Sequence, residues 1–386
     1  MRGAQARDQG RAVPGRDGAP GAGQGHREPA RREGQARRGR SGRGPRSGAR
    51  GRRQAETGAG LARLTALAAA LALSAAPAAA GLLPPNGAFS SAAAGTTGAA
   101  FLHDSFGARA AAMGGAVAAA AQGAESLFQN PAALARLRPD SPSEAAFGYD
   151  ALLETAYHGA AAYARPLGDF GAVAAGLVYA SQSPQTAYTA TGDSAGTFTA
   201  LDWAGGAGYA RRVGPVALGA GLKAIGSKVA DASGTTFAAD LGALWTHATD
   251  LGQGPLDAGL AVENLGPPIK LGQSSDALPL TARAGAVWHP TPNLDAALDV
   301  VFPVDQDVYA ALGVEARFPA AMLGSDRPWV AALRGGYDQN RGRDVTGFAG
   351  ASFGAGLDFS LFRVDYAWLA LGALGSSNRV TLAFRF

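Results

Sequence analysis

The feature that most constrains this chain is a strict alternation of side-chain character over its last ten residues, 377–386. Val380, Leu382, Phe384 and the terminal Phe386 are apolar, and the residues between them are small or polar. A period of two is the period of a β-strand, because successive side chains point to opposite faces. A terminal aromatic on such a strand is typical of the last strand of a membrane barrel. Phe384 and Phe386 are therefore candidates for the signal that barrel-assembly machinery reads.

Thirteen further segments upstream show similar alternation and are separated by turn residues. The predicted strands are 143–153, 157–166, 170–181, 198–211, 215–226, 236–247, 255–264, 279–289, 293–302, 307–318, 328–338, 345–353, 357–369 and 377–386. Each is close to the length of about 9–11 residues that a tilted strand needs to cross a bilayer. The predicted fold class is all-β, an antiparallel transmembrane barrel of about fourteen strands over residues 142–386. A soluble sandwich with one exposed face remains the alternative.

Composition supports a barrel over a helical membrane protein. Hydrophobic residues make up 47% of the chain, yet the mean hydropathy is near zero. Beyond the first eighty residues no apolar run reaches the roughly 18 residues of a spanning helix. The chain has no cysteine, which excludes disulfides and thiolate metal sites.

The basic balance of the chain comes from residues 1–53. They hold 15 arginines against 4 acids, so the remaining residues carry a net charge of −7 although the whole chain is +4. This Arg/Gly-rich stretch cannot bury a core and is predicted to be disordered. It is either a natural extension or, as we prefer, the product of a start site assigned too early. An arginine-rich arm for nucleic acid would carry interleaved aromatic residues, which are absent.

Residues 54–80 are predicted to be a signal peptide. Arg52, Arg53 and Arg63 supply the positive region, residues 64–76 the apolar core, and residues 78–80 a small-residue cleavage site before Gly81. The alternative, a membrane anchor, fits poorly because the apolar run is short and ends at proline. The protein is therefore expected to be exported.

Residues 81–141 are rich in small residues and are predicted to form an N-terminal plug packed inside the barrel. Asn130 is predicted to cap a short helical turn, with Pro131 at its first position and the turn continuing to Arg136. Gly114 and Gly115 allow the backbone to pass close to other backbone. An Ala-rich helix pair of a soluble protein is the other interpretation.

The connections are predicted to differ between the two ends of the barrel. Residues 167–169, 213–215, 290–292 and 354–356 read as tight turns on the side shared with both termini, the expected periplasmic side. The longer links 183–197, 266–277 and 339–344 fall on the outer side. Two links, 247–254 and 319–327, are longer than a periplasmic turn should be.

Charged residues within a predicted strand share one parity, as expected if the other face meets lipid. Three predicted strands illustrate this rule, with the pairs Glu315/Arg317, Arg334/Asp338 and Arg363/Asp365. These side chains are predicted to face the lumen and to pair across neighbouring strands. Asp202 and Arg211 break the rule.

No sequence pattern that is typical of an enzyme has the neighbouring residues that its chemistry requires. Residues 192–196 (GDSAG) match the nucleophile elbow of serine hydrolases, but Thr-rich residues follow where a helix is needed. The five histidines have no metal-ligand spacing, and no phosphate or dinucleotide loop is present. The sequence predicts neither an enzyme, a metal site nor a cofactor.

The chain resembles the FadL-like outer-membrane proteins, and more closely their PorV/PorQ branch. The stretches that carry the resemblance are GARAAAMGGAVAAAAQGAESLFQNPAAL, AVENLGPPIK with LPLTARAGAVW, FRVDYAW and the terminal AFRF. The resemblance implies a fourteen-stranded barrel with an N-terminal plug. The plug motif would comprise Arg109, Met113, Gly114 and Gly115 with the Asn-Pro-Ala turn of Asn130, Pro131 and Ala132.

The resemblance also implies a function in the outer membrane, with two alternatives. Our main expectation is a PorV/PorQ-like component that binds exported cargo proteins in a type IX-like secretion apparatus. The alternative is a FadL-like channel for uptake of hydrophobic small molecules, and a purely structural protein is a third possibility. The implied partners are outer-membrane lipid, the barrel-assembly machinery, and either cargo proteins or hydrophobic molecules, with no nucleic acid.

Overall fold

The computed structural model describes residues 83–84, 87–104, 106–152, 155–343 and 345–386. The Arg/Gly-rich stretch 1–53 and the signal peptide 54–80 of the sequence analysis lie outside the described residues. Within the described chain, no helix is long and apolar enough to span a membrane.

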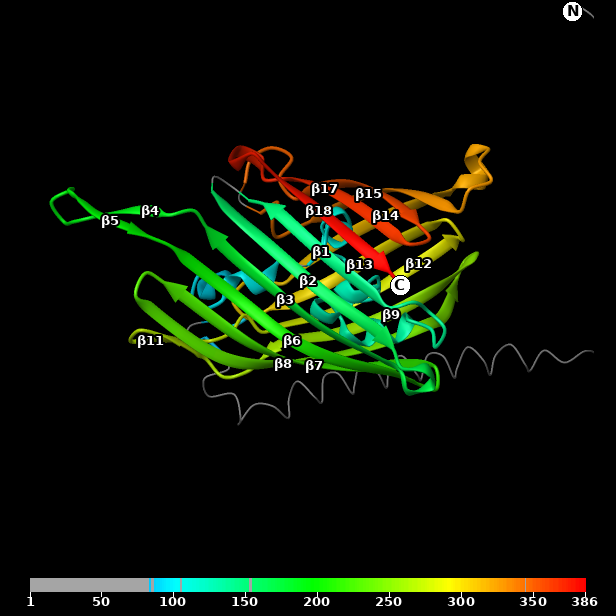
Figure 1. The fold of residues 1–386 in the computed structure, drawn as a ribbon, viewed down its shortest axis with the longest axis horizontal. Coiled ribbons are helices and arrows are strands. Elements are labelled where there is room, and N and C mark those ends of the chain that lie inside the picture. Colours follow the sequence, from blue (N-terminus) through cyan, green and yellow to red (C-terminus); the bar gives the residue numbers. More distant parts are fainter. Residues whose placement is uncertain (1–82, 85–86, 105, 153–154, 344) are drawn as a thin grey trace, which may run out of the picture. The chain divides into compact units, whose positions relative to one another are not determined.

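Fourteen antiparallel strands close into a barrel (Figure 1). The barrel strands are β1 (Glu144–Ala151), β2 (Ala156–Pro166), β3 (Ala172–Gln182), β6 (Ala200–Val213), β7 (Val216–Val229), β8 (Ala232–Leu251), β9 (Gly254–Leu265), β12 (Thr281–Thr291), β13 (Leu294–Pro303), β14 (Tyr309–Pro319), β15 (Trp329–Asp338), β16 (Ala351–Phe359), β17 (Phe362–Ala370) and β18 (Ser376–Arg385). Each strand pairs with its neighbours in the chain, and β18 pairs with β1 to close the ring. The predicted fold class and the closing role of the last strand are confirmed, and the open sandwich is excluded.

Short elements complete the described chain. Two hairpins outside the barrel are β4 (Gln185–Tyr188) with β5 (Ser194–Phe198), and β10 (Ile269–Leu271) with β11 (Ser274–Asp276). The helical elements are η2 (Ser91–Ala93), η3 (Ala100–His103), α2 (Ala108–Ala112), η4 (Ala124–Phe128), η5 (Pro131–Arg136), η6 (Gly168–Phe170), η7 (Ala320–Leu323) and η8 (Gly372–Leu374).

The barrel is apolar outside and polar inside, which inverts the arrangement of a soluble protein. In β18, Val380, Leu382 and Phe384 are 39–44% exposed, whereas Arg379 and Thr381 are at most 4% exposed. The other strands repeat this pattern, with leucine, valine and aromatic side chains on the exposed face. An apolar exterior around a charged interior is the signature of a barrel whose outer solvent is lipid.

One predicted turn is wrong. Residues 354–356 lie in the middle of β16, and the chain turns instead at residues 360–361, between β16 and β17. Gly354 and Gly356 serve close approach on the inner face of the strand and not a turn. A Cβ atom on Gly354 would meet Ala112, and one on Gly356 would meet the ion pair of Asp365 and Arg334.

The predicted link 247–254 is also wrong, because β8 continues to Leu251 and pairs with the start of β9. The pairing of β8 with β9 is interrupted by two bulges, and each bulge contains a residue with positive φ, His247 (φ 54°) and Asn264 (φ 64°). In each case an aspartate of the partner strand accepts the backbone N–H, Asp257 for His247 and Asp240 for Asn264. The carboxylates satisfy backbone donors that the regular ladder leaves unpaired at a bulge.

The connections at the two ends of the barrel differ in length. One end, here called the tight-turn end, has short connections such as residues 214–215, 252–253 and 360–361. The opposite end, here called the long-link end, carries the two extra hairpins and the links 304–308 and 339–350. The predicted link 319–327 lies at the tight-turn end and contains η7.

Residues 87–142, here called the inner segment, run from the long-link end to the start of β1. The N–H of Phe89 donates to the carbonyl of Val304, and Thr97 forms a bridge to Ala277, both at the long-link end. At the other end, Ser143 and the C-terminal Phe386 exchange two backbone hydrogen bonds of 3.0 Å. The prediction that both termini share the tight-turn end therefore fails for the described start of the chain, because the segment passes through the interior before β1 begins.

In most barrel strands, the residue closest to the inner segment is a glycine. A Cβ atom at any of these positions would overlap an atom of the inner segment, since the two come into direct contact there. They are Gly148, Gly176, Gly208, Gly219, Gly242, Gly259, Gly313, Gly336 and Gly354. The small residues of the inner segment and these glycines together let one extra stretch of chain fit inside a fourteen-stranded ring.

Candidate functional site

The Asn-Pro-Ala turn lies deep in the interior and joins the inner segment to the barrel wall. The Asn130 side chain accepts from the N–H of Ala132 at 3.0 Å, with Pro131 at the first position of η5, so the predicted cap is confirmed. Its amide nitrogen donates to the carbonyl of Ala118 at 2.6 Å and to that of Leu260 in β9 at 3.2 Å. Asn130 is fully buried, so its hydrogen bonds form in a low-dielectric setting where they are strong.

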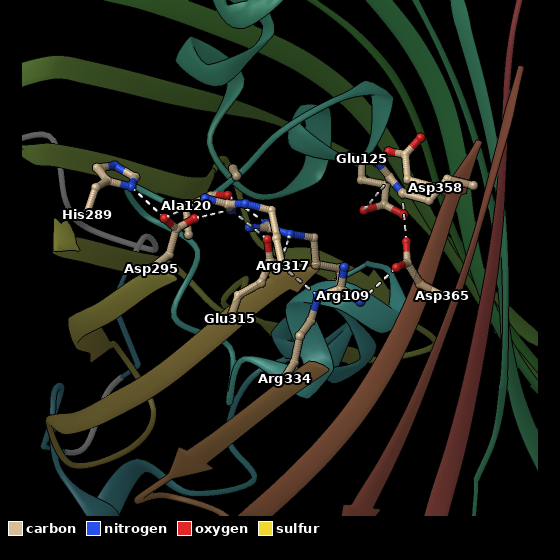
Figure 2. Close-up of polar contacts among 12 residues, drawn as sticks. Arg109, Ala120, Glu125, His289, Asp295, Glu315, Arg317, Arg334, Asp358 and Asp365 are labelled. Carbon is tan, nitrogen blue, oxygen red and sulfur yellow. Dashed lines mark hydrogen bonds and ion pairs between the residues drawn. The ribbon is translucent and has the colours of Figure 1, made fainter. Parts of the chain in front are cut away.

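Arg109 in α2 connects the inner segment to β14. Its Nε donates to Glu315 at 2.8 Å, and a terminal nitrogen donates to the carbonyl of Ala120 at 2.8 Å (Figure 2). Glu315 also accepts from Arg334 of β15 at 2.7 Å and from Arg317 at 2.9 Å. One buried carboxylate therefore compensates charges from the inner segment and from two strands.

The ion pairs extend around the inner wall from this point. Arg334 donates to Asp365 of β17 at 2.7 Å, and Asp365 also accepts from Arg363 at 2.7 Å. On the other side, Arg317 contacts Asp295 of β13, which also contacts His289 at 2.6 Å. These ion pairs form one continuous chain of charges on the inner face, here called the Glu315 cluster. Its members are Arg109, Glu315, Arg317, Arg334, Arg363 and Asp365.

Glu125 of η4 lies at the end of this chain and is only weakly paired. Among the described residues, its ion-pair partner is Arg363, with 3.8 Å between Nη2 and Oε2, and its Oε1 has no hydrogen-bond partner there. Burial raises the pKa of Glu125 to about 7, with Asp365 and Glu144 adding to the rise and Arg363 and Arg109 opposing it. Glu125 is therefore a group of the inner segment that titrates near neutral pH.

The remaining residues of the sequence motif lie against β14 and β15. Met113 is fully buried beside Gly313, and Gly114 (φ 65°) passes the backbone of Tyr337. Gly115 (φ 80°) offers its carbonyl to Arg283 of β12 at 3.4 Å. Positive φ at two successive residues turns the chain sharply, which only glycine does without strain.

A pocket lies in the long-link half of the barrel, between the inner segment and β1, β2 and β3. Its apolar lining includes Phe101, Leu102, Phe106, Phe128 and Val178. The rings of Phe106 and Phe128 meet edge to face, with centroids 6.2 Å apart. We call this the Phe106 pocket.

The far side of the Phe106 pocket is polar. Lys223, Glu263 and Asn264 contribute to it from β7 and β9. Lys223 is paired with Asp240 at 2.8 Å, and Glu263 with Arg283 at 3.0 Å. Asp104, Asp150 and His158 also line the pocket, from the inner segment, β1 and β2. The pocket therefore combines apolar rings with paired charged groups on both sides.

Sequence reasoning missed the residues of this pocket. Phe101 and Phe128 lie in the short turns η3 and η4, and Phe106 lies between elements. None belongs to a periodic pattern, so no local signal assigns them to one surface. The positive φ of Asn264 was equally hidden, although an asparagine before Leu-Gly-Pro is a recognisable turn signal.

Phe384 and Phe386 lie on the exposed face at the tight-turn end. Phe384 packs edge to face on Phe147, and Phe386 stacks on Tyr163 at 6.2 Å. Ser194 of the GDSAG stretch begins β5 in an exposed hairpin, with no helix after it. Among the described residues, no cluster of histidine and acidic side chains has the arrangement of a metal site.

Comparison with known proteins shows a fold relationship. No protein-family model matches the chain, and no curated protein matches it. Among solved structures, it is similar to the "TodX monoaromatic hydrocarbon channel deltaS2 mutant", with a TM-score of 0.50 and 11% identity over 73% of this chain and 99% of that one. A deltaS2S3 mutant of the same channel gives a TM-score of 0.50 and 12% identity, covering 73% and 99%.

A FadL homologue from Pseudomonas aeruginosa gives a TM-score of 0.44 and 13% identity, covering 80% of this chain and all of that one. Identities of 11–12% in the two TodX matches show a shared barrel fold. The fourteen-stranded barrel fold implied by the resemblance is therefore confirmed, whereas membership of the FadL-like proteins and of their PorV/PorQ branch stays a prediction.

Proposed function

We propose that this chain is an outer-membrane barrel that takes up hydrophobic small molecules, with the Phe106 pocket as the site of capture. The observation that carries the proposal is a pocket in the long-link half of the barrel on which three phenylalanines, a leucine and a valine converge. Asp104, Asp150, His158, Lys223 and Glu263 also line it. Aromatic and aliphatic side chains that converge on one pocket are a usual element of a site for a small hydrophobic ligand.

The fold supports this function over the secretion role that was our main expectation. The TodX variants are named as monoaromatic hydrocarbon channels, and they share the barrel of this chain. Transport of this kind requires binding and passage, without a catalytic step.

The inner segment acts as a plug in this proposal. Its Arg109 and Asn130 fix it to β14 and β9, and its fully buried residues fill the centre of the barrel. A molecule that binds in the Phe106 pocket therefore meets the inner segment next, and onward passage depends on a shift of that segment or on an exit through the wall.

The test is uptake of carbon-14 p-xylene by Gram-negative cells that produce this chain and lack a channel of their own. We expect faster uptake than in cells without the protein. A Phe106→Ala and Phe128→Ala double variant removes two aromatic contacts and should lower the gain about tenfold.

The matched control is Phe353→Ala. Phe353 also belongs to an aromatic pair, stacking on Trp368 at 6.1 Å, but it lies on the exposed face of the barrel. It should leave uptake unchanged. Equal uptake with and without the protein, when a heat-modifiability gel shows a folded barrel, would overturn the proposed function.

A further inference from the structure

Arg211, one of the two residues that break the parity rule of the sequence analysis, lies on the outer face of β6. It shares its parity with Tyr209 and Val213, which are 43% and 58% exposed, and alternates with Ala210, which is fully buried. Asp202, the other exception, has the parity of Ala210 and therefore faces inward. Arg211 is thus a cation in a row of side chains that lipid covers.

A second arginine lies on the same outer face, two strands away. Arg165 of β2 shares its parity with the exposed Tyr163 and lies opposite Val173 of β3. Val173 in turn lies opposite Tyr209, two residues before Arg211, and the three strands are neighbours in the wall (Figure 1). The strand spacing and the rise per residue place the two arginine Cα atoms on the order of 12 Å apart. Two side chains of this length can reach one group between them.

Both arginines lie near the tight-turn end of the barrel. Arg165 is the last residue but one of β2, and Arg211 is the third from the end of β6. The cost of a charge on the lipid face falls steeply from the bilayer centre to its surface. Phe170 in the β2–β3 turn is 71% exposed, and aromatic side chains gather at the level of the lipid headgroups. The two cations therefore lie at the depth of the headgroups.

The described protein does not compensate these two charges. Neither Arg165 nor Arg211 has a side-chain hydrogen bond or an ion pair among the described residues. The next residue, Arg212, faces inward and donates to Thr246 at 2.9 Å. Asp202 is the single acidic residue of β2, β3 and β6, and it faces the interior. The outer face of these three strands therefore carries positive charge alone.

A pocket of about 390 Å³ adjoins the end of β6. It lies between residues 135–139 of the inner segment, the β2–β3 turn and β6. The charged residues of its lining are Arg136, Arg138, Arg211, Arg212 and Asp169. Arg136 is already paired with Asp257 at 2.8 Å, so one carboxylate, Asp169, stands against three further arginines. The pocket has an excess of positive charge next to the outer arginines.

A phosphate group that carries acyl chains fits these surroundings. Guanidinium groups bind phosphate oxygens through paired, charge-assisted hydrogen bonds. A free phosphate ion would satisfy the arginines but would leave the apolar rows around them uncovered, whereas a phospholipid supplies both parts. A zwitterionic lipid would also bring an ammonium group to a face without an acid. The charge balance favours a lipid with a net negative charge.

We propose that Arg165 and Arg211 form a binding site for the phosphate of an anionic phospholipid, with its acyl chains along the outer face of β3 and β6. The tight-turn end is the expected periplasmic end, so the lipid belongs to the inner leaflet of the outer membrane. This site is separate from the Phe106 pocket and does not depend on the proposed uptake.

The test is native mass spectrometry of the full chain, folded in detergent, with phosphatidylglycerol or phosphatidylcholine of the same acyl chains. The measured quantity is the Kd of the first bound phosphatidylcholine divided by that of the first bound phosphatidylglycerol. We expect a clear preference for phosphatidylglycerol, and an Arg165→Gln and Arg211→Gln double variant should lower this ratio about tenfold. Each single substitution is measured as well, so that a double variant that fails to fold does not end the test.

The matched control is a Lys228→Gln and Lys270→Gln double variant. It removes the same charge from exposed positions in β7 and β10 at the long-link end. It should keep the native ratio. A heat-modifiability gel establishes that each variant is folded.

Three outcomes would overturn the proposal. The first is an unchanged ratio in the folded arginine variants. The second is an equal fall in the lysine control, which would show a general attraction to net charge and not a site. The third is displacement of phosphatidylglycerol by inorganic phosphate but not by chloride of equal ionic strength, which would show that the arginines take a free ion and not a lipid.

Discussion

At the scale of single residues, the interior of this barrel depends on a few shared carboxylates. Glu315 receives hydrogen bonds from Arg109, Arg317 and Arg334, and the last of these also pairs with Asp365. Buried ion pairs of this kind are weak evidence for stability, because desolvation offsets much of the attraction. Removing one partner is a different matter, since it leaves a buried charge uncompensated.

Glu315→Gln should therefore lower the stability of the folded barrel by about 3–5 kcal/mol, because Arg109 loses its anionic partner and Arg334 loses one of its two. The measurement is urea unfolding in detergent, followed by the mobility shift between folded and unfolded forms on a gel. Asp250→Asn is the control, since its pair with His247 is exposed on both sides and should change stability little. Equal effects of the two substitutions would contradict the arrangement of the Glu315 cluster.

Glu125 makes stability depend on pH in a defined direction. Its pKa in the folded protein is about 7, above the ordinary 4.5, so between these values the folded state binds more protons than the unfolded chain. The unfolding free energy contributed by this group therefore falls as pH rises through the window from 4.5 to 7, by on the order of 2–3 kcal/mol.

Glu125→Gln keeps the shape and removes the titration. The variant should match the native protein near pH 4.5 and exceed its stability at pH 8, as measured by the urea midpoint at each pH. A difference between the two proteins that does not change with pH would show that Glu125 is not the titrating group.

At the scale of elements, the strands and the inner segment fit together through glycines. Two neighbouring glycines of β15 illustrate this, because Gly336 faces inward against Gly114 and Met113, whereas a Cβ on Gly335 meets no other atom within 4 Å. Alternation along one strand thus separates a position that tolerates no side chain from one that does.

Gly336→Val should displace the inner segment, and Gly335→Val should not. The chain has no cysteine, so a single Ala116→Cys reports on the segment cleanly. Ala116 is fully buried, and we expect a water-soluble maleimide to label it slowly in the native protein and in Gly335→Val, and much faster in Gly336→Val. Slow labelling in all three folded proteins would show that the segment does not depend on this contact.

At the scale of the whole molecule, the exposed apolar face requires a lipid environment for the barrel to be stable. Leu333 at the middle of β15 is 58% exposed, and Leu374 in η8 at the long-link end is 63% exposed. Two leucines of similar exposure thus differ in their position along the barrel axis, and only the first lies where a bilayer would cover it.

Leu333→Arg should destabilise the barrel in lipid by about 2–4 kcal/mol, while Leu374→Arg should have little effect, because the penalty for a charge falls from the bilayer centre to its surface. The measurement is the urea midpoint of the protein folded into lipid vesicles. If both variants matched the native protein, the exposed leucine face would not be in contact with lipid.

The sequence by itself determined the all-β class, the count of fourteen strands, the closing role of residues 377–386 and the cap at Asn130. These features depend on spacing along the chain, since a period of two and an Asn-Pro pair act locally. The same local signals misplaced the turn at residues 354–356, because a glycine that allows a turn and a glycine that allows close approach look alike in sequence.

Only the tertiary structure decided which charges meet and where a pocket forms. Arg109 and Glu315 lie 206 residues apart, and Asn264 lines one pocket with phenylalanines that the chain places more than a hundred residues earlier. Alternation tells which face of a strand a side chain occupies, but not which neighbour lies opposite. The partners are fixed by the register of the closed ring and by the path of the inner segment through it, and both are properties of the folded chain.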